Sequence, residues 1–583
     1  MHTTNEIHVG ADSIIHFLSQ MGIKVLHNFP GGTIAPLLDA CHKFNIRVIT
    51  SRHEQGAGYA ALAQAKLTGL PGIVAVTSGP GVTNVMTSVA DAYFDGIPML
   101  VFTGQVGTAD LARHKDIRQR GFQEVDTPLL MQPITKAQYQ PHNVSELLEM
   151  IPEAWQKAME GRKGPVSIDL PMDVQRAQFT RSLFCLNASE IRVDGDALAV
   201  FINPLISAIT QAKRPVIIAG NGMMNPKNID GFKQLLKIWP VPVSSSLLAV
   251  GLVDSDSKLC LGFHGHTGSQ VAGLAIHEAD LVLVLGSRLD VRQTGTQTQN
   301  FAPHAKKFRV DFDRAEIAYS RVDVDSTYYG ALQHFLPELL AKLQNLQQTL
   351  PDLSPWYQKI AEYKSQFGWC YPEYPGLAPQ SVIEQISKAI SSPVICVTGV
   401  GSHQHWVARH FRFHYPQRQL LTSAGHGAMG YDLPTAIGAA IHAPETQVLC
   451  IVGDGSLQMN IQELGMIQEY QLKIKIVVLD NHRLGLVSQF QLMNWETDTA
   501  CGLKKSPDFF AIAQAYGIRA FHATKQSEFE AVLDDFVKAD SAALLHLELD
   551  SRHDVLPMLL GPQSMDKMWP FYDMQGELRE QSK

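Results

Sequence analysis

Two stretches of the sequence place oxygen-bearing side chains where runs that look like buried strands end. The run VLCIVGDG ends in a corner containing Asp454, and the run KIVVLDN ends in Asn481. The carboxyl ends of parallel strands meet at one edge of a sheet, so a strand–helix–strand unit would place Asp454 beside Asn481. A carboxylate and an amide oxygen suit Mg²⁺, and Gly453 and Gly455 would allow a diphosphate to approach the backbone. The pattern predicts a metal–diphosphate site.

The segment between these two ends should be one helix, because Ile461, Leu464 and Ile467 recur at helical spacing. Either corner alone would read as an ordinary turn. Their order and the strand–helix–strand setting together favour the metal–diphosphate interpretation.

A third candidate group, Glu54, lies far away in the chain within ITSRHEQGAGYAALAQAKLTG. An isolated His–Glu pair is typical of a solvated surface. This pair instead stands between a strand-like run and an Ala/Gly-rich helix without an obvious charged face, which predicts burial. A buried carboxyl group could exchange a proton with a ring nitrogen of a cofactor.

The elements that must position these groups are short β-branched runs alternating with helical stretches, a pattern typical of parallel α/β layers. The runs fall into three groups separated by polar or Pro-rich joints, such as the joint at 184–196. Three domains agree with a length of 583 residues. The predicted divisions are an N-terminal domain at 1–185, a central domain at 195–350, a C-terminal domain at 375–565 and a tail at 566–583.

Composition excludes several classes of function. A net charge of −8 without a basic block argues against a nucleic-acid partner. No apolar run is long enough to span a membrane. The 7 scattered cysteines form no CxxC pair, and the N-terminus has no secretory pattern, so we expect a cytoplasmic protein with reduced thiols.

The run from Gly453 to Asn481 resembles the thiamine diphosphate (ThDP) motif, and the stretch around Glu54 resembles the RHEQGA stretch of the same enzymes. Nearly the whole chain is similar to the acetolactate (acetohydroxyacid) synthases. The resemblance implies an α/β fold of three doubly wound parallel-sheet domains: pyrimidine-binding, middle and diphosphate-binding. It is carried by FPGGTIAPLLDA, SGPGVTN, GFQEVD, GVGSHQHW, TSAGHGAMGYDLPTAIGAA and HDVLPMLLGP.

The resemblance also implies roles for individual residues. Catalytic positions would be Glu54, Gly32, Phe122 and Gln123. The cofactor would contact Glu54, Gly401, His403, Gln404, Gly427, Met429, Gly453, Gly455, Ser456, Met459 and Leu486. Mg²⁺ would be held by Asp454, Asn481 and the backbone carbonyl of Arg483.

The resemblance is incomplete around the second substrate. Arg292 is retained as the group that would pair with an acceptor carboxylate. Met172 stands where the synthases carry Lys, and Phe490 stands where they carry Trp. The segments LGFHGHTGS, GSRLDVRQTG and VDFDRAEI are similar to flavin-lining segments, which implies FAD without a redox role, although each would also serve as an ordinary strand-end loop.

The expected activity is ThDP- and Mg²⁺-dependent decarboxylation of pyruvate and transfer of the two-carbon unit to a second 2-oxoacid. The alternatives are a related ThDP lyase or carboligase with a sugar-linked ketone or aldehyde as acceptor, a simple 2-oxoacid decarboxylase, or a silent paralogue that only binds ThDP. Retention of Glu54 argues against the silent paralogue. Expected partners are small-molecule substrates, further copies in a homodimer or homotetramer, and a regulatory small subunit, with no nucleic acid and no membrane.

Overall fold

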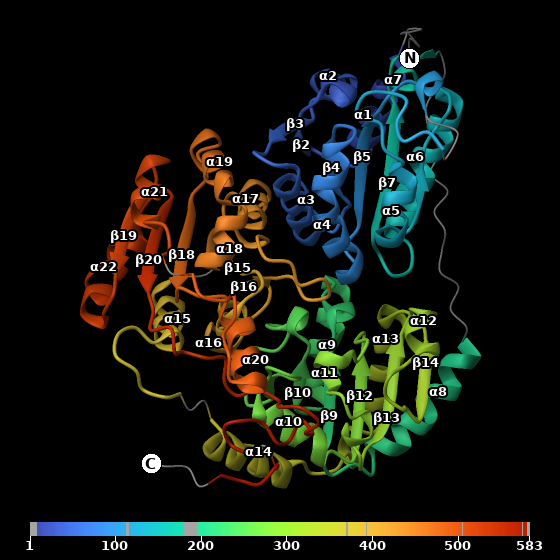
Figure 1. Cartoon of the computed structure of the whole chain (residues 1–583). Coiled ribbons are helices and arrows are strands. Elements are labelled where there is room, and N and C mark those ends of the chain that lie inside the picture. Colours follow the sequence, from blue (N-terminus) through green and yellow to red (C-terminus); the bar gives the residue numbers. More distant parts are fainter. Residues whose placement is uncertain are drawn as a thin grey trace.

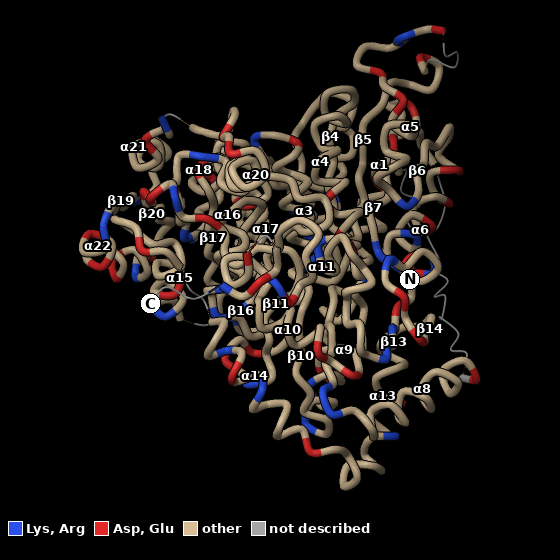
Figure 2. The backbone as a smooth tube through the Cα atoms, turned by 60° about the horizontal axis from the view of Figure 1, so that its bottom comes forward, with Lys and Arg blue, Asp and Glu red and all other residues tan. Residues whose placement is uncertain are grey.

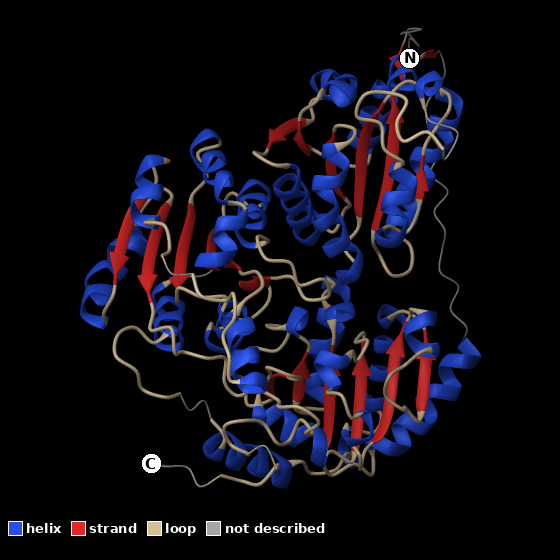
Figure 3. Ribbon diagram, viewed as in Figure 1, coloured by secondary structure: helices blue, strands red, loops and turns tan. Residues whose placement is uncertain are grey.

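The structure is a computed structural model that describes residues 8–111, 116–179, 195–368, 371–391, 393–503, 505–573 and 575–579. Three six-stranded sheets follow one another along the chain, and helices cover both faces of each (Figures 1 and 3). The predicted α/β fold of three parallel-sheet domains is confirmed. The joint expected between 185 and 195 lies in 180–194, outside the described residues.

The N-terminal sheet is parallel throughout, and its strands alternate their side chains between two cores. In spatial order its strands are β3 (Arg47–Thr50), β2 (Val25–Phe29), β4 (Gly72–Val76), β5 (Met99–Gln105), β7 (Pro165–Pro171) and β6 (Gln138–Tyr139). Its helices are α1 (Gly10–Gln20), α2 (Ala35–Lys43), α3 (Glu54–Thr68), α4 (Pro80–Asp95), α5 (Thr127–Met131), α6 (Val144–Met159) and α7 (Met172–Arg176). A two-stranded ribbon of β1 (His8–Val9) and β8 (Gln178–Phe179) lies beside it.

The central sheet is also parallel. In spatial order its strands are β11 (Cys260–Phe263), β10 (Val243–Ser245), β9 (Pro215–Ala219), β12 (Leu281–Leu285), β13 (Lys306–Asp311) and β14 (Ser326–Tyr329). Its helices are α8 (Gly195–Ile209), α9 (Pro226–Ile238), α10 (Gln270–Glu278), α11 (Val291–Thr294), α12 (Arg314–Ala318), α13 (Leu332–Gln344) and α14 (Ser354–Gln366). The C-terminal segment returns to this domain, where Met565, Met568 and Phe571 join its core.

The C-terminal sheet repeats the pattern. In spatial order its strands are β16 (Arg418–Leu421), β15 (Val394–Val397), β17 (Gln447–Gly453), β18 (Ile474–Asp480), β20 (Ala543–Glu548) and β19 (Arg519–Ala523). Its helices are α15 (Pro379–Ala389), α16 (Ser402–His410), α17 (Asp432–His442), α18 (Asp454–Met459), α19 (Leu464–Glu469), α20 (Gly485–Trp495), α21 (Phe509–Ala515) and α22 (Gln526–Lys538).

The connection between β17 and β18 differs from the single helix expected from the sequence. It is divided into α18, a 3₁₀ turn (Ile461–Glu463) and α19. The break lies at Asn460, which leaves helical geometry and donates its side-chain amide to the carbonyl of Gly430 at 2.7 Å. Leu464 and Ile467 are nevertheless buried in the same core, as their spacing predicted.

The N- and C-terminal domains pack through helices α3 and α17, which lie side by side in an interior with few charges (Figures 1 and 2). Small residues permit this approach, because a Cβ atom on Gly438 would lie 2.5 Å from the carbonyl oxygen of Ala60. The two domains therefore share one hydrophobic core. Within the described ranges, no helix combines the length and apolarity that a membrane crossing requires.

A histidine pair bridges the same two domains. The Nε2 atoms of His27, on β2, and His442, at the end of α17, lie 3.0 Å apart. Burial and the nearby Arg47 lower the pKa of His442 to about 4. Burial and the neighbouring His442 lower the pKa of His27 well below its ordinary value. Both rings are therefore neutral at neutral pH.

We expect this pair to make the folded state sensitive to acid. The unfolded chain binds a proton at each histidine near pH 6.5, whereas folded His442 resists until about pH 4, so stability falls as pH decreases between these values. Unfolding midpoints measured across this range should fall less steeply in His442→Gln than in wild type. His42→Ala, which changes an exposed histidine of α2, is the matched control and should keep the wild-type slope. Parallel slopes for His442→Gln and wild type would contradict the prediction.

Candidate active site

Two acidic side chains meet at the carboxyl ends of β17 and β18. These strands pair in parallel with Gly453 opposite Leu479, so Asp454 follows one strand where Asp480 ends the other. Both carboxylates are buried. The Ser506 hydroxyl donates to Asp480 at 2.8 Å and lies 3.3 Å from Asp454 Oδ2. The sequence predicted Asp454 at this edge, whereas Asp480 and Ser506 were missed.

The electrostatics of this pair suit a cation. Burial and the neighbouring Asp480 raise the pKa of Asp454 to about 8. Burial alone would raise the pKa of Asp480 as well, but hydrogen bonds from His546 and Ser506 hold it below its ordinary value. A divalent ion would relieve the repulsion between two buried carboxylates, and an all-oxygen donor set fits Mg²⁺.

The other predicted metal ligands lie in the loop that follows β18. Asn481 is buried, and its side-chain oxygen accepts a hydrogen bond from the backbone N–H of Arg483 at 3.3 Å. The Arg483 guanidinium donates to Ser488 Oγ at 3.0 Å and to Asp554 Oδ1 at 2.7 Å. Asn481 directly follows Asp480 in the chain, and the roles of its side chain and of the Arg483 carbonyl as metal ligands stay predictions.

A buried aspartate, Asp432, links the loop at Gly399 to the helix that begins at Asp454. Asp432, the first residue of α17, accepts hydrogen bonds from the backbone N–H of Gly399 and from the hydroxyl of Ser456, and it contacts His403 Nε2 at 3.0 Å. Ser456 in turn accepts from the backbone N–H of Gly430 at 2.9 Å. Asp432 was missed, although it stands within the quoted stretch GYDLP at a helix start.

The predicted glycines are positions of close approach. A Cβ atom on Gly453 would lie 2.9 Å from His403 Nδ1, and one on Gly455 would lie 2.8 Å from Leu484 and 3.4 Å from Met429 Cε. Gly427 adopts φ +74°, which favours glycine.

The remaining predicted cofactor contacts surround this loop cluster. Gln404 donates to Thr422 Oγ1 at 2.8 Å and to the carbonyl of Ser423 at 2.6 Å, so it links α16 to the loop after β16. Gly401 is the N-cap residue of α16. Met429 and Leu486 are partly exposed, and Met459 is 54% exposed.

Glu54 belongs to a second cluster at the carboxyl edge of the N-terminal sheet. It begins α3 and is 5% exposed, which confirms the predicted burial. Asn84 of α4 donates to its Oε2 atom at 3.0 Å. A further acid missed from the sequence, Glu463, reaches across from the C-terminal domain and accepts the backbone N–H of Arg52 with both oxygens at 3.1 Å.

The other predicted catalytic residues occupy loops of the same domain. Gly32 begins a 3₁₀ turn after β2, and a Cβ atom there would meet nothing within 4 Å. Gln123 adopts φ +61°, and its carbonyl oxygen would lie 2.9 Å from a Cβ atom on Gly79. Phe122 is 84% exposed.

The three predicted substrate residues come from three different domains. Arg292 lies in α11 and is exposed at the wall of a cavity. Phe490, on α20, is 51% exposed and packs edge-to-face against Trp495. Met172 is partly buried at the start of α7. Their grouping around one acceptor stays a prediction.

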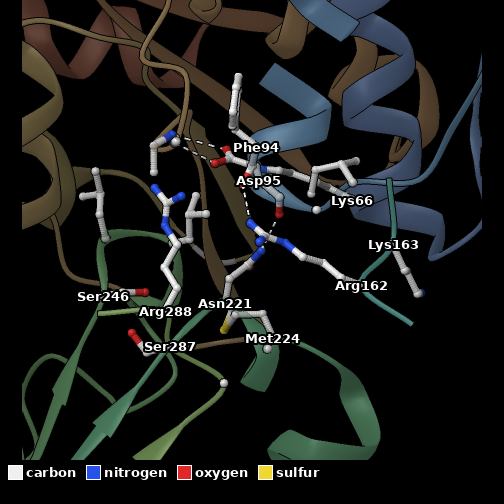
Figure 4. A pocket seen from close by; sticks show the side chains of 18 of the residues that line it. Lys66, Phe94, Asp95, Arg162, Lys163, Asn221, Met224, Ser246, Ser287 and Arg288 are labelled. Carbon is white, nitrogen blue, oxygen red and sulfur yellow. Dashed lines mark hydrogen bonds between the residues drawn. The ribbon is translucent and has the colours of Figure 1, made fainter. Parts of the chain in front are cut away.

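A cavity of about 1250 Å³ lies among the three domains at the carboxyl ends of β9, β12 and β13 (Figure 4). Its wall joins the domains, since Asn221 donates to the carbonyl of Asp95 at 2.9 Å and Arg162 pairs with Glu316 at 2.8 Å. Gly220 packs so closely that a Cβ atom would lie 2.2 Å from the Gly286 carbonyl. The arrangement leaves a large cavity with a partly polar wall.

Comparison with known proteins agrees with this architecture. Residues 8–129 match the model "Thiamine pyrophosphate enzyme, N-terminal TPP binding domain", residues 202–339 match its central domain, and residues 399–547 match its C-terminal TPP binding domain. The three sheets and their strand-end clusters thus define a thiamine pyrophosphate enzyme, and thiamine diphosphate is its cofactor.

Individual relatives identify the family within the thiamine pyrophosphate enzymes. The chain is 36% identical over 565 residues to the acetolactate synthase isozyme 1 large subunit of Escherichia coli, covering 96% of this chain and 97% of the relative. It is 35% identical over 565 residues to the acetolactate synthase large subunit of Lactococcus lactis, covering 96% of both chains. Against the mitochondrial catalytic subunit of Saccharomyces cerevisiae, identity is 34% over 586 residues, covering 96% and 84%. The chain belongs to the acetolactate synthase large-subunit family and is a ThDP-dependent, acetolactate synthase-like enzyme.

Proposed function

We propose that this enzyme decarboxylates pyruvate and joins the two-carbon unit to a second 2-oxoacid, with Mg²⁺ holding the cofactor diphosphate. The observation that carries the proposal is buried Glu54, oriented by Asn84 at 3.0 Å. A protein that only bound the cofactor would need the diphosphate end alone. A positioned carboxyl group on the opposite domain supports catalysis.

Each cluster would contribute a separate task. When bound, ThDP supplies a carbon nucleophile for the 2-oxoacid and accepts the electron pair left by departing CO₂. Glu54 would hold a proton at N1′ of the cofactor's pyrimidine ring. Asp454 and Asn481 would hold Mg²⁺, and the buried carboxylates would balance its charge.

The test is product analysis. Incubation with pyruvate, ThDP and Mg²⁺ should yield acetolactate. Acetaldehyde as the only product would replace the proposal with a simple decarboxylase, and acetolactate formation independent of the enzyme's ThDP would contradict it.

The acceptor site should show little preference between pyruvate and 2-oxobutyrate. Phe490 is smaller than the Trp of related synthases and lacks its N–H group, and one methylene group in an apolar pocket is worth only about 1–3 kcal/mol. Met172, which stands where the synthases carry Lys, removes a positive charge that would attract an anionic acceptor, so an uncharged ketone or aldehyde could act as acceptor. Arg292 would still pair with the carboxylate of a 2-oxoacid. A competition assay at equal concentrations of both 2-oxoacids measures the preference.

Two variants test the role of Phe490 in that assay. Phe490→Trp should shift the products toward acetohydroxybutyrate, whereas Leu492→Trp, another exposed apolar position of α20, should not. A wild-type mixture dominated by acetohydroxybutyrate would refute the pocket argument.

We also propose that the interdomain cavity binds FAD. Two buried ring nitrogens that line it, His264 Nε2 and His266 Nδ1, lack hydrogen-bond partners within the described structure, so a polar ligand would satisfy them. Asp311 ends β13 at the same wall and could accept from a ribose hydroxyl. Volume and donor set both fit a dinucleotide.

The enzyme should be at least a homodimer, with a homotetramer as the larger form. Glu54 and Asp454 belong to different domains, and three residues predicted to line the site, Phe122, Met459 and Phe490, have exposed apolar side chains. Burying them against a second copy would complete the site. Light scattering should show no active monomer, and an active monomer would contradict this prediction. Because relatives are called large subunits, we also propose a smaller regulatory partner.

A further inference from the structure

Three metal-ligating side chains gather beyond the candidate active site, on the edge of the C-terminal sheet. His522 on β19 and His546 on β20 are partners in the strand register, and Glu548 follows two residues later on the same face of β20. One ligand atom from each lies within 4.8 Å of the other two. Adjacent parallel strands therefore hold two imidazoles and a carboxylate together.

The hydrogen bonding of His546 leaves one ring nitrogen available. Its Nε2 atom lies 3.1 Å from Asp480 Oδ2, and a carboxylate oxygen is a hydrogen-bond acceptor, so Nε2 is the donor of this pair. This hydrogen bond leaves Nδ1 as the ring nitrogen that could bind a metal ion. That atom is buried without a hydrogen-bond partner in the described structure, on a residue only 5% exposed. A protein carboxylate fixing the second nitrogen is the usual support of a metal-bound histidine.

The other two ligands are reachable from solvent. His522 Nε2 and Glu548 Oε1 lie 2.9 Å apart, and their side chains are 37% and 40% exposed. Two ligands of a tetrahedral ion at about 2.0–2.1 Å would lie about 3.3 Å apart. Small movements of these two solvent-exposed side chains would therefore complete the geometry around the buried His546.

We propose that His522, His546 and Glu548 form a site for a borderline-soft divalent metal such as Zn²⁺. Two imidazoles and one carboxylate form a common zinc ligand set that leaves one position for water. Imidazole donors favour zinc over Mg²⁺, whereas the oxygen-rich cluster at Asp454 favours Mg²⁺. The two sites are thus chemically distinct, and the new site does not depend on the proposed reaction.

The test is Zn²⁺ titration of the full-length enzyme saturated with ThDP and Mg²⁺, using a competing chromophoric chelator. Wild type should bind one tight equivalent of Zn²⁺ per chain. Mutating residues that only hydrogen-bond to metal ligands already lowers metal affinity by about 10–100-fold. His522→Ala and Glu548→Gln remove ligands themselves, so each should lower the affinity for this Zn²⁺ ion by at least about 10-fold. Both residues are outside the catalytic clusters, so circular dichroism and turnover without Zn²⁺ should remain as in wild type.

His142→Ala is the matched control. His142 and Glu146 form another His–Glu pair, in which the ring nitrogen and the carboxylate lie 3.3 Å apart at an exposed helix end. Among the described residues, no third metal-binding side chain joins this pair. This variant should keep wild-type Zn²⁺ affinity. Equal affinity in wild type, His522→Ala and Glu548→Gln, or loss in His142→Ala alone, would overturn the proposed site.

Discussion

Replacing Glu54 with Gln should reduce turnover by about 10²–10⁴-fold while leaving ThDP binding nearly unchanged. The amide keeps the size of the side chain and can still accept from Asn84, which now donates to Glu54 Oε2 at 3.0 Å. It cannot exchange a proton with the pyrimidine ring. Because the diphosphate would be held by the C-terminal domain, the loss should appear in kcat and only weakly in cofactor affinity.

Steady-state kinetics at saturating ThDP, together with a cofactor titration followed by intrinsic fluorescence, separate the two effects. Glu469→Gln is the matched control, since Glu469 lies on the same interdomain contact, paired with Arg52, but is partly exposed. It should keep nearly full turnover. A Glu54→Gln enzyme with wild-type kcat would remove Glu54 from the mechanism.

Replacing Asp454 with Asn should have the opposite signature, a loss of cofactor retention. The change removes a negative charge from the proposed Mg²⁺ ligands while keeping their shape. Mutating residues that only hydrogen-bond to metal ligands already lowers metal affinity by about 10–100-fold. Because Asp454 would be a ligand itself, we expect Mg²⁺-dependent ThDP binding to weaken by at least about 10-fold. Equal cofactor loss in Glu54→Gln and Asp454→Asn would show that the division of roles between the domains is wrong.

The same variant should be more stable than wild type when Mg²⁺ is removed. Burial and Asp480 raise the pKa of Asp454 from 3.8 to about 8 in the folded chain. Between these pH values the folded chain keeps this proton while the unfolded chain releases it. The metal-free wild type therefore loses folding stability as pH rises toward 8. Asn carries no charge and avoids this loss. Thermal unfolding in a chelator at pH 8 should give a higher midpoint for Asp454→Asn, and adding Mg²⁺ should stabilise wild type more than the variant. A lower midpoint for metal-free Asp454→Asn would contradict the electrostatic account.

The sequence by itself determined the class of fold and the position of one edge of the site. Continuous apolar runs predicted β17 and β18, because strands that are buried on both faces consist mostly of apolar residues. Parallel pairing of two such strands brings their carboxyl ends together. The Ala/Gly-rich helix after Glu54 likewise predicted a buried carboxyl group, which the structure confirms. Short edge strands such as β14 and β19 were not found, since partly exposed edge strands do not require continuous apolar runs.

Only the tertiary structure decided which groups surround the predicted ones. Glu463 bonds the backbone of Arg52 across 411 residues, and His27 meets His442 across 415 residues. Asp480 and His546 likewise meet only because β18 and β20 are neighbours in the sheet. Periodicity records which face of an element is buried, but not which element covers it. The partners that set the charge and proton positions of the site are fixed by packing between distant segments, and they became visible only with the folded chain.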